Sequence, residues 1–161
     1  MNNIRIYELI KAVVFDLGDT LVSQETGDSF PFAVEVLDWL KGHYRLALIT
    51  NVLSTTPREK INSILRDAGL EGFFDVIVVS SEYGFSKPDP RIFEIAFNEL
   101  GVRAEEAVMI GNMISTDIFG ANRVGMKTIL FQPQEVYQRS EWENPDHEIR
   151  SLRELINILK K

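Results

Sequence analysis

The chain has 161 residues, of which 45% are hydrophobic and 25% are charged, which predicts one globular domain over residues 1–161 with a large core. It contains no cysteine, which excludes disulfides, thiolate metal sites and a thiol nucleophile. Its formal net charge of −7 argues against a nucleic-acid partner, because binding to phosphate backbones requires a basic surface.

The sequence lacks features that would target it to a membrane. No segment approaches the roughly 18 consecutive apolar residues that a membrane helix needs. The first residues, MNNIRIYELIK, lack the charged-then-apolar layout of a signal peptide. We therefore expect a cytoplasmic protein with no membrane partner. Residues 1–10 suit a short strand or a short helix equally well.

Five short apolar runs recur along the chain, at residues 12–15, 46–49, 76–79, 107–110 and 128–131. They suit fully buried strands, since none alternates strictly with polar residues. Helical patterns lie between and after them, with apolar faces formed by Phe32, Val36, Leu37 and Leu40, by Ile61, Ile64, Leu65 and Ala68, by Ile92, Phe93, Ala96, Phe97 and Leu100, and by Leu152, Leu155, Ile156 and Leu159. This alternation predicts an α/β fold, a doubly wound parallel five-stranded sheet with helices on both faces.

Two of the predicted helices carry start signals. Thr56, Pro57 and Glu59 have the spacing of a capping box with proline at the first helical position. Asp89 followed by Pro90 repeats the sequence of a capping residue and then proline. We expect a helix to begin at each of these points.

Polar residues follow the predicted strands at their carboxyl ends, where open parallel sheets bind ligands. Each of them alone would suit a turn or a helix cap. Their convergence on one edge of the sheet instead predicts a functional site. In chain order these residues are Asp16, Thr50 with Asn51, Ser80 with Ser81, and Gly111 with Asn112, followed five residues later by Asp117.

Four motifs in a fixed order extend over nearly the whole chain. They are VVFDLGDTLV at 13–22, LALITN at 46–51, GFSKPDPRIFEIAFNELGV at 84–102 and VMIGNMISTDIFGANRVGM at 108–126. In this order they resemble the four motifs of the haloacid dehalogenase-like hydrolase superfamily. The resemblance implies a Rossmann-like core and a phosphatase-type member that uses Mg²⁺ and an aspartyl-phosphate intermediate.

The resemblance also implies a role for each motif residue. Asp16 would be the nucleophile and a metal ligand, and Lys87 would neutralise the phosphoryl oxygens and keep Asp16 ionised. Thr50 and the backbone amide of Asn51 would donate hydrogen bonds to the same oxygens. Such cations are needed because a carboxylate that attacks a phosphate dianion is repelled by it. The remaining Mg²⁺ ligands would be the backbone carbonyl of Gly18, the side-chain oxygen of Asn112, and Asp117.

Two positions depart from the family pattern. Gly18 stands where family phosphatases usually carry a second aspartate, which protonates the leaving group. Loss of a general acid typically lowers the rate by about 10²–10⁴-fold, and esters with good leaving groups should suffer least. Asn112 stands where the fourth motif usually begins its acidic pair, so we expect Mg²⁺ to bind on the order of 10-fold more weakly.

These departures keep two other interpretations open. The first is a catalytically impaired member that binds a phosphorylated ligand or a protein partner without turnover. The second is a phospho-accepting receiver domain, whose accepting aspartate should follow the third strand, where this chain has Ser80 and Ser81. Dehalogenation is disfavoured because the chain keeps an acidic metal loop and has no room for a cap.

The short connections predict an uncapped, open site. The segment from Thr20 to Leu46 has room for a loop and one helix, and the segment from Thr50 to Lys87 has room for one helix and one strand. We therefore expect the partner to be a small-molecule phosphate ester or a larger phosphorylated substrate. Alternatively, a second subunit of a homo-oligomer covers the site.

The segment QPQEVYQRSEWENPDHE at 132–148 leaves the carboxyl end of the last predicted strand. It is expected to be a surface excursion whose aromatic residues pack onto the domain. The alternative is that Tyr137 and Trp142, with Arg139 between them, form a rim of the site or an oligomer contact, since long loops are often functional.

Overall fold

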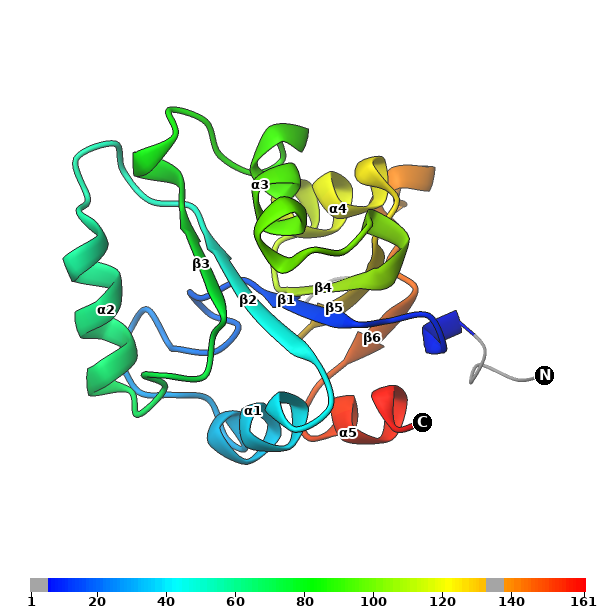
Figure 1. The fold of residues 1–161 in the computed structure, drawn as a ribbon, viewed down its shortest axis with the longest axis horizontal. Helices are drawn as coiled ribbons and strands as arrows, with labels where there is room; N and C mark the ends of the chain where they lie inside the picture. Colours follow the sequence, from blue (N-terminus) through cyan, green and yellow to red (C-terminus); the bar gives the residue numbers. More distant parts are fainter. Residues whose placement is uncertain (1–5, 133–137) are drawn as a thin grey trace.

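The computed structural model describes residues 6–132 and 138–161, and they form one six-stranded parallel sheet. The strand order is β3-β2-β1-β4-β5-β6 (Figure 1), which confirms the doubly wound α/β class. The same order separates this fold from receiver-type sheets, which follow the order 2-1-3-4-5. The strands are β1 (Ala12–Phe15), β2 (Arg45–Thr50), β3 (Val76–Val79), β4 (Ala107–Gly111), β5 (Lys127–Phe131) and β6 (His147–Ile149).

The predicted number of strands was wrong by one. The additional strand, β6, pairs in parallel with β5 and lies at the end of the segment that was expected to be a surface excursion. It has only three residues, and only Ile149 among them is buried. So short a strand carries no apolar run, and pairing with β5 is what defines it.

In the described parts of the chain, five α-helices cover the sheet on both faces (Figure 1). Apolar residues of α1, α2 and α5 join the core on one face, and those of α3 and α4 join the core on the other. The helices are α1 (Ala33–Lys41), α2 (Arg58–Asp67), α3 (Pro90–Leu100), α4 (Phe119–Val124) and α5 (Glu154–Leu159). A single π-helical turn, Ile114–Ile118, precedes α4.

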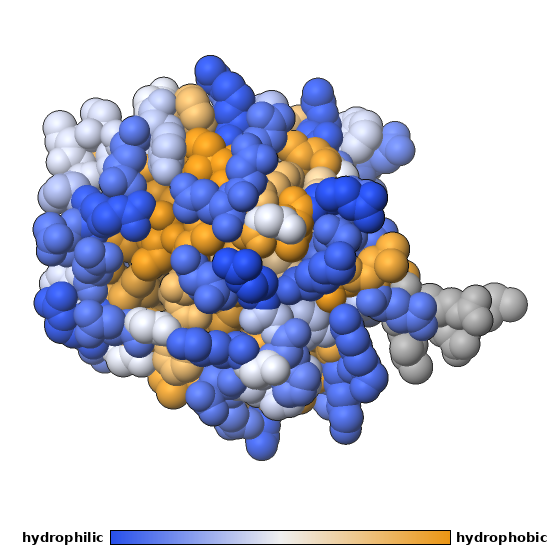
Figure 2. Space-filling model, viewed as in Figure 1, coloured by the Kyte–Doolittle hydropathy of each residue, from blue (hydrophilic) through white to orange (hydrophobic). Residues whose placement is uncertain are grey.

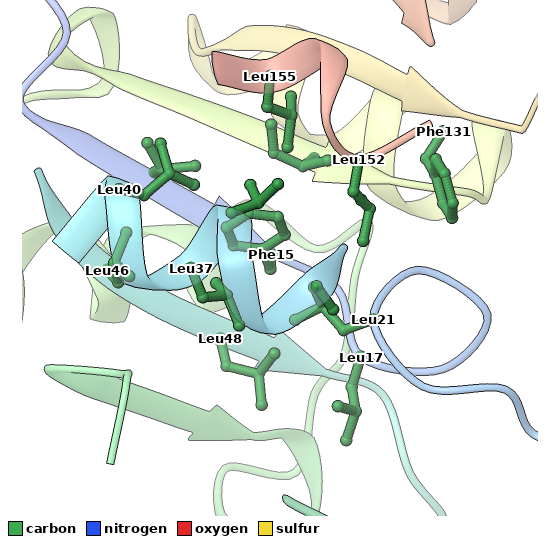
Figure 3. Packing of buried hydrophobic residues seen from close by; sticks show 14 of the residues in the cluster. Phe15, Leu17, Leu21, Leu37, Leu40, Leu46, Leu48, Phe131, Leu152 and Leu155 are labelled. Atoms are coloured by element: carbon green, nitrogen blue, oxygen red, sulfur yellow. The ribbon is translucent and has the colours of Figure 1, made fainter. Parts of the chain in front are cut away.

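The central strand β1 divides its side chains between the two cores. Phe15 points to the side of α1, and Val14 belongs to the core beneath α3. Figure 3 shows Phe15 among leucines of α1 and β2, and none of its surface is exposed. Burial of such a side chain stabilises the fold by about 1.5–3 kcal/mol. Because both faces of β1 are buried, the strand that carries Asp16 is held rigidly.

One of the two predicted helix starts is confirmed. Asp89 is the N-cap of α3, its side chain accepts a hydrogen bond from the Arg91 amide, and Pro90 is the first helical residue. The capping box at α2 was wrong. Pro57 is itself the N-cap in an extended conformation, no side chain caps the helix, and the helix begins at Arg58. The Pro57 carbonyl accepts a hydrogen bond from the Lys60 amide, so the first turn closes without Thr56 or Glu59.

Phe32 was expected on the buried face of α1 but is 44% exposed. It is the N-cap of that helix and has a left-handed backbone, with φ of 68°. This conformation removes Phe32 from the helical register that buries Val36, Leu37 and Leu40. Its ring lies instead under the Arg153 guanidinium, 5.1 Å from the ring centroid.

Strand β3 forms one edge of the sheet. In Figure 2, apolar side chains gather on the face of the molecule that is turned toward the reader. Arg58 covers part of that edge, since its Nη2 donates to the carbonyl of Ile77 at 2.7 Å. The same guanidinium is paired with Glu82 at 2.6 Å. A charged side chain over an edge strand hinders pairing with another chain.

The connections between the strands are short, as expected for an uncapped core. A loop and α1 join β1 to β2, and α2 joins β2 to β3. Over residues 6–132 and 138–161 no additional domain lies between these elements, and none of the helices is long and apolar enough to span a membrane. Residues 6 and 7 form a short 3-10 helical turn and residues 8 and 9 a turn, so the described part of this segment contains no strand.

Glu106 ties the start of β4 to the start of β1. Its carboxylate accepts from Lys11 Nζ at 2.7 Å and from the Arg103 amide at 2.9 Å. The Arg103 amide, followed by the Lys11 ammonium, holds the pKa of Glu106 at about 2, below its ordinary value of 4.5. The ionised carboxylate therefore stabilises the folded state.

Replacement Glu106→Gln should lower the melting temperature at pH 7 and lower it progressively less as the pH falls below 4.5. A pKa that is depressed on folding contributes stability above the unfolded-state pKa and loses it as the pH falls toward the folded-state value. Thermal unfolding of both proteins between about pH 7 and pH 2.5 measures this, with the exposed Glu25→Gln as control. A gap between wild type and Glu106→Gln that is independent of pH would contradict it.

Candidate active site

The predicted site residues lie at the point where the strand order reverses, between β1 and β4. Asp16 directly follows β1, and its amide donates to the Ile110 carbonyl of β4 at 3.0 Å. Asn112 directly follows β4. The chain leaves these adjacent strands toward opposite sides, which opens a crevice at their carboxyl ends.

Lys87 lies at the centre of this crevice, between two carboxylates. Its Nζ is 2.9 Å from Asp16 Oδ1 and 2.8 Å from Asp117 Oδ1. It also donates to the Ile49 carbonyl at 2.7 Å. An ammonium group has three N–H donors, and these three acceptors use all of them.

The three charged groups are removed from water. Lys87 is 3% exposed, Asp117 1% and Asp16 9%. Burial opposes the charge on Lys87, but Asp117 and Asp16 outweigh it and raise the pKa of the ammonium. Burial also raises the pKa of Asp117, against the nearby Lys87 that lowers it. The cluster carries one positive and two negative charges, so it has an excess of negative charge.

Asn51 holds the backbone of Lys87 in place. Its amide nitrogen donates to the Lys87 carbonyl, and its side-chain oxygen accepts from the Lys87 amide, both at 2.9 Å. This pair of bonds joins the loop after β2 to the loop before α3. The side chain of Asn51 is thus a positioning group for Lys87, while the predicted role of its backbone amide toward a phosphoryl group stays a prediction.

Asp117 is positioned by the π-helical turn and by a glycine. Its amide donates to the Met113 carbonyl, and its Oδ2 accepts from the Met113 amide at 3.1 Å. A Cβ on Gly111 would lie 2.3 Å from Asp117 Oδ2, closer than any side chain allows. The glycine at the end of β4 therefore makes room for this carboxylate.

Thr20 belongs to the site and was missed by the sequence reading. It is fully buried, and its Oγ1 donates to Asp16 Oδ2 at 3.2 Å. The same hydroxyl is 3.4 Å from Asn112 Oδ1. The spacing of four residues between Asp16 and Thr20 within a tight turn was the signal that could have identified it.

The predicted metal ligands provide a donor set that suits Mg²⁺. No group of three or more histidine or carboxylate side chains comes together in the described parts of the chain, so amide and carbonyl oxygens would have to complete the set. Asp16 Oδ2 and Asn112 Oδ1 both lie within 3.4 Å of the Thr20 hydroxyl, which has only one proton to donate. A hard cation near these two oxygens would also balance the excess negative charge.

A pocket of about 600 Å³ opens beside this cluster. Its lining includes Asp16, Thr50 and Lys87 together with Gly18, Asn51 and Asn112. Residues that the sequence reading did not assign to the site also line it. They are Leu17, Asp19, Val22, Ser23, Gln24, Gly27, Val52, Lys60, Ile61, Ile64, Met113 and Thr116.

The described part of the 132–148 segment docks on α4. Asn122 donates from its side chain to the carbonyls of Trp142 and Asn144, each at 2.8 Å. The Arg123 guanidinium lies 5.6 Å from the centroid of the Trp142 ring. Trp142 is still 44% exposed. Tyr137 lies outside the described residues, and a rim or an oligomer contact formed by this segment stays a prediction.

Replacement Lys87→Met should lower the free energy of unfolding by about 3–5 kcal/mol, because two buried carboxylates lose their counter-charge. Chemical denaturation at neutral pH measures the loss, with the exposed Lys60→Met as a matched control. At acidic pH the difference in the free energy of unfolding between Lys87→Met and wild type should become smaller, since protonated carboxyl groups need no positive partner. A Lys87→Met protein as stable as the control would contradict the buried ion cluster.

The comparisons with known proteins agree with this arrangement. The family model for haloacid dehalogenase-like hydrolase matches residues 8–131. The chain is 36% identical over 121 residues to glyceraldehyde 3-phosphate phosphatase from Methanopyrus kandleri, covering 73% of this chain and 50% of the relative. It is 34% identical over 137 residues to ribulose-1,5-bisphosphate 5-phosphatase from Halopiger xanaduensis, covering 80% and 56%. The chain thus spans about half the length of the curated relatives that it matches.

Solved structures show the same core. A HAD phosphatase from Thermococcus onnurineus superposes with a TM-score of 0.81 at 23% identity, covering 94% of this chain and 98% of that one. The magnesium-bound putative HAD-hydrolase YfnB from Bacillus subtilis has a TM-score of 0.74 at 30% identity, covering 85% and 58%. By its family match, its relatives and its fold, the chain belongs to the haloacid dehalogenase-like hydrolase family.

Proposed function

We propose that this chain is a Mg²⁺-dependent phosphatase that hydrolyses phosphate monoesters through an aspartyl-phosphate on Asp16. The observation that carries the proposal is the contact of Lys87 Nζ with Asp16 Oδ1 at 2.9 Å, beside an open pocket. The carboxylate of Asp16 lines this pocket and is the candidate nucleophile. The named activities of its relatives, which are phosphatases of small sugar phosphates, support a small phosphate ester as the substrate.

The chemistry has two steps at phosphorus. Asp16 forms a bond to phosphorus, and the bond between phosphorus and the leaving oxygen breaks, so that this oxygen leaves with the electron pair and takes a proton from water. A water molecule then attacks phosphorus, which releases inorganic phosphate and restores the carboxylate. Thr50, 5% exposed at the end of β2, donates a hydrogen bond from its hydroxyl to a phosphoryl oxygen.

Lys87 contributes to these steps mainly through its charge. Its three N–H groups donate to Asp16, Asp117 and the Ile49 carbonyl, so none is left to donate to a substrate. It therefore stabilises added negative charge through its own positive charge. Asp16, Asp117, Asn112 and the carbonyl of Gly18 would hold Mg²⁺. When bound, the cation supplies the positive charge that lets the carboxylate approach a phosphate dianion.

A second candidate function is binding of a phosphorylated ligand or protein without turnover. Gly18 and Asn112 favour it, since the first leaves no general acid two residues past the nucleophile and the second removes one negative charge from the metal site. The contact of Lys87 with Asp16 and Asp117 favours the enzyme, because a buried ion cluster has no need to lie beside a pocket for stability alone.

An assay with Mg²⁺ on aryl and alkyl phosphates tests the proposed function. Wild type should release phosphate from aryl esters on the order of 10²-fold faster than from alkyl esters, because Gly18 cannot protonate the leaving group. Asp16→Asn should remove turnover by a factor on the order of 10³ or more, whereas Asp67→Asn at the exposed end of α2 should retain it. Equal rates on both ester classes would contradict the bias, and turnover by Asp16→Asn would contradict the nucleophile.

The affinity for Mg²⁺ tests the metal site independently of turnover. Asn112→Asp restores a carboxylate and should tighten Mg²⁺ binding on the order of 10-fold, measured by isothermal titration calorimetry. The control Asn98→Asp adds the same charge on the exposed side of α3 and should leave the affinity unchanged. An affinity that does not differ between wild type and Asn112→Asp would exclude Asn112 from the metal site.

A further inference from the structure

Gly18 is not required by the backbone of its turn. Six glycines in the described chain have positive φ, and Gly18 is not one of them, so its backbone suits any residue. A Cβ on Gly18 would lie 2.7 Å from Gln24 Nε2, 3.0 Å from its Cδ and 3.1 Å from its Cγ. The space in which a side chain at position 18 would begin is therefore filled by Gln24.

Asp19 holds Gln24 in this place. Its two carboxylate oxygens accept from the Gln24 backbone amide at 3.0 Å and from Nε2 at 3.1 Å. Asp19 itself has φ of 57°, and its amide donates to the Val22 carbonyl at 2.7 Å, which closes the turn. Gln24 is exposed to solvent, yet its backbone amide and its side-chain amide both donate to the same carboxylate.

Gln24, Asp19 and Gly18 all line the pocket together with Asp16. One N–H of the Gln24 amide is used by Asp19, and a carboxamide nitrogen carries a second N–H. A carboxamide donates a hydrogen bond but gives up no proton. An oxygen that leaves phosphorus near it is stabilised by polarity alone.

The rest of the lining is mixed in character. It combines apolar side chains, among them Val22 and Ile61, with polar ones, among them Thr50, Asn51 and Lys60. An aryl alcohol leaves without a proton more readily than an alkyl alcohol, so a hydrogen bond to the leaving oxygen matters most for the poorer leaving groups.

We propose that Gln24, held by Asp19 in the space beside Gly18, is a specificity-determining residue that donates a hydrogen bond to the leaving oxygen and so lessens the advantage of good leaving groups over poor ones. This inference rests on the proposed phosphatase function. It extends that function by assigning the leaving-group side of the pocket to the loop after β1.

The test uses a series of substituted phenyl phosphates whose leaving-group pKa values span several units, with Mg²⁺ present. Gln24→Ala should lower kcat/KM about 10-fold for the poorest leaving group and only slightly for the best, so that the dependence of log kcat/KM on leaving-group pKa becomes steeper. A purely structural role would lower all rates by the same factor. Glu25→Ala, on the exposed neighbour, should leave the dependence unchanged.

A second variant tests the juxtaposition itself. Gly18→Ala places a methyl group where Gln24 lies and should displace its amide, so it should produce the same steeper dependence as Gln24→Ala. The double variant should then be no steeper than either single variant. Additive effects of the two substitutions, or an unchanged slope in Gln24→Ala, would overturn the inference. Absence of turnover by wild type on every ester would instead overturn the proposed function.

Discussion

The site depends on one buried ion cluster, in which the Lys87 ammonium is shared by Asp16 and Asp117. Each of these charges alone would be unstable at this depth, because burial removes the hydration that a charge requires. Together they are compensated, and the Ile49 carbonyl takes the last ammonium proton. The cluster forms because the loop after β1, the loop before α3 and the π-helical turn after β4 place their side chains at the same point.

The parallel sheet makes this meeting possible. β1 and β4 are neighbours whose helices lie on opposite faces, so their carboxyl ends border a crevice that no helix fills. Asn51 then connects the end of β2 to the backbone of Lys87. Rigid strands buried on both faces set the position of Asp16, and the loops adjust around it. The chemistry of the site is therefore a property of the sheet order as much as of the motif residues.

The two unusual residues, Gly18 and Asn112, change the character of the site without removing its core. Asn112 retains an oxygen toward the Thr20 hydroxyl but carries no charge. The space that a side chain at position 18 would occupy is filled by Gln24, whose side-chain amide donates a hydrogen bond to Asp19. A site of this kind keeps the buried ion cluster of Lys87 with Asp16 and Asp117, while positions 18 and 112 add no charge to it.

The sequence by itself determined the α/β class, five of the six strands and the start of α3, because buried apolar runs and the pairing of aspartate with proline are local properties. Tertiary structure alone decided the contacts of Lys87 with Asp117 and the Ile49 carbonyl, the burial of Thr20, the place of Gln24, the exposure of Phe32 and the existence of β6. These features arise between residues far apart in the chain or from a single backbone angle. Such contacts leave no periodic pattern in the sequence, since only the packed sheet brings their members together.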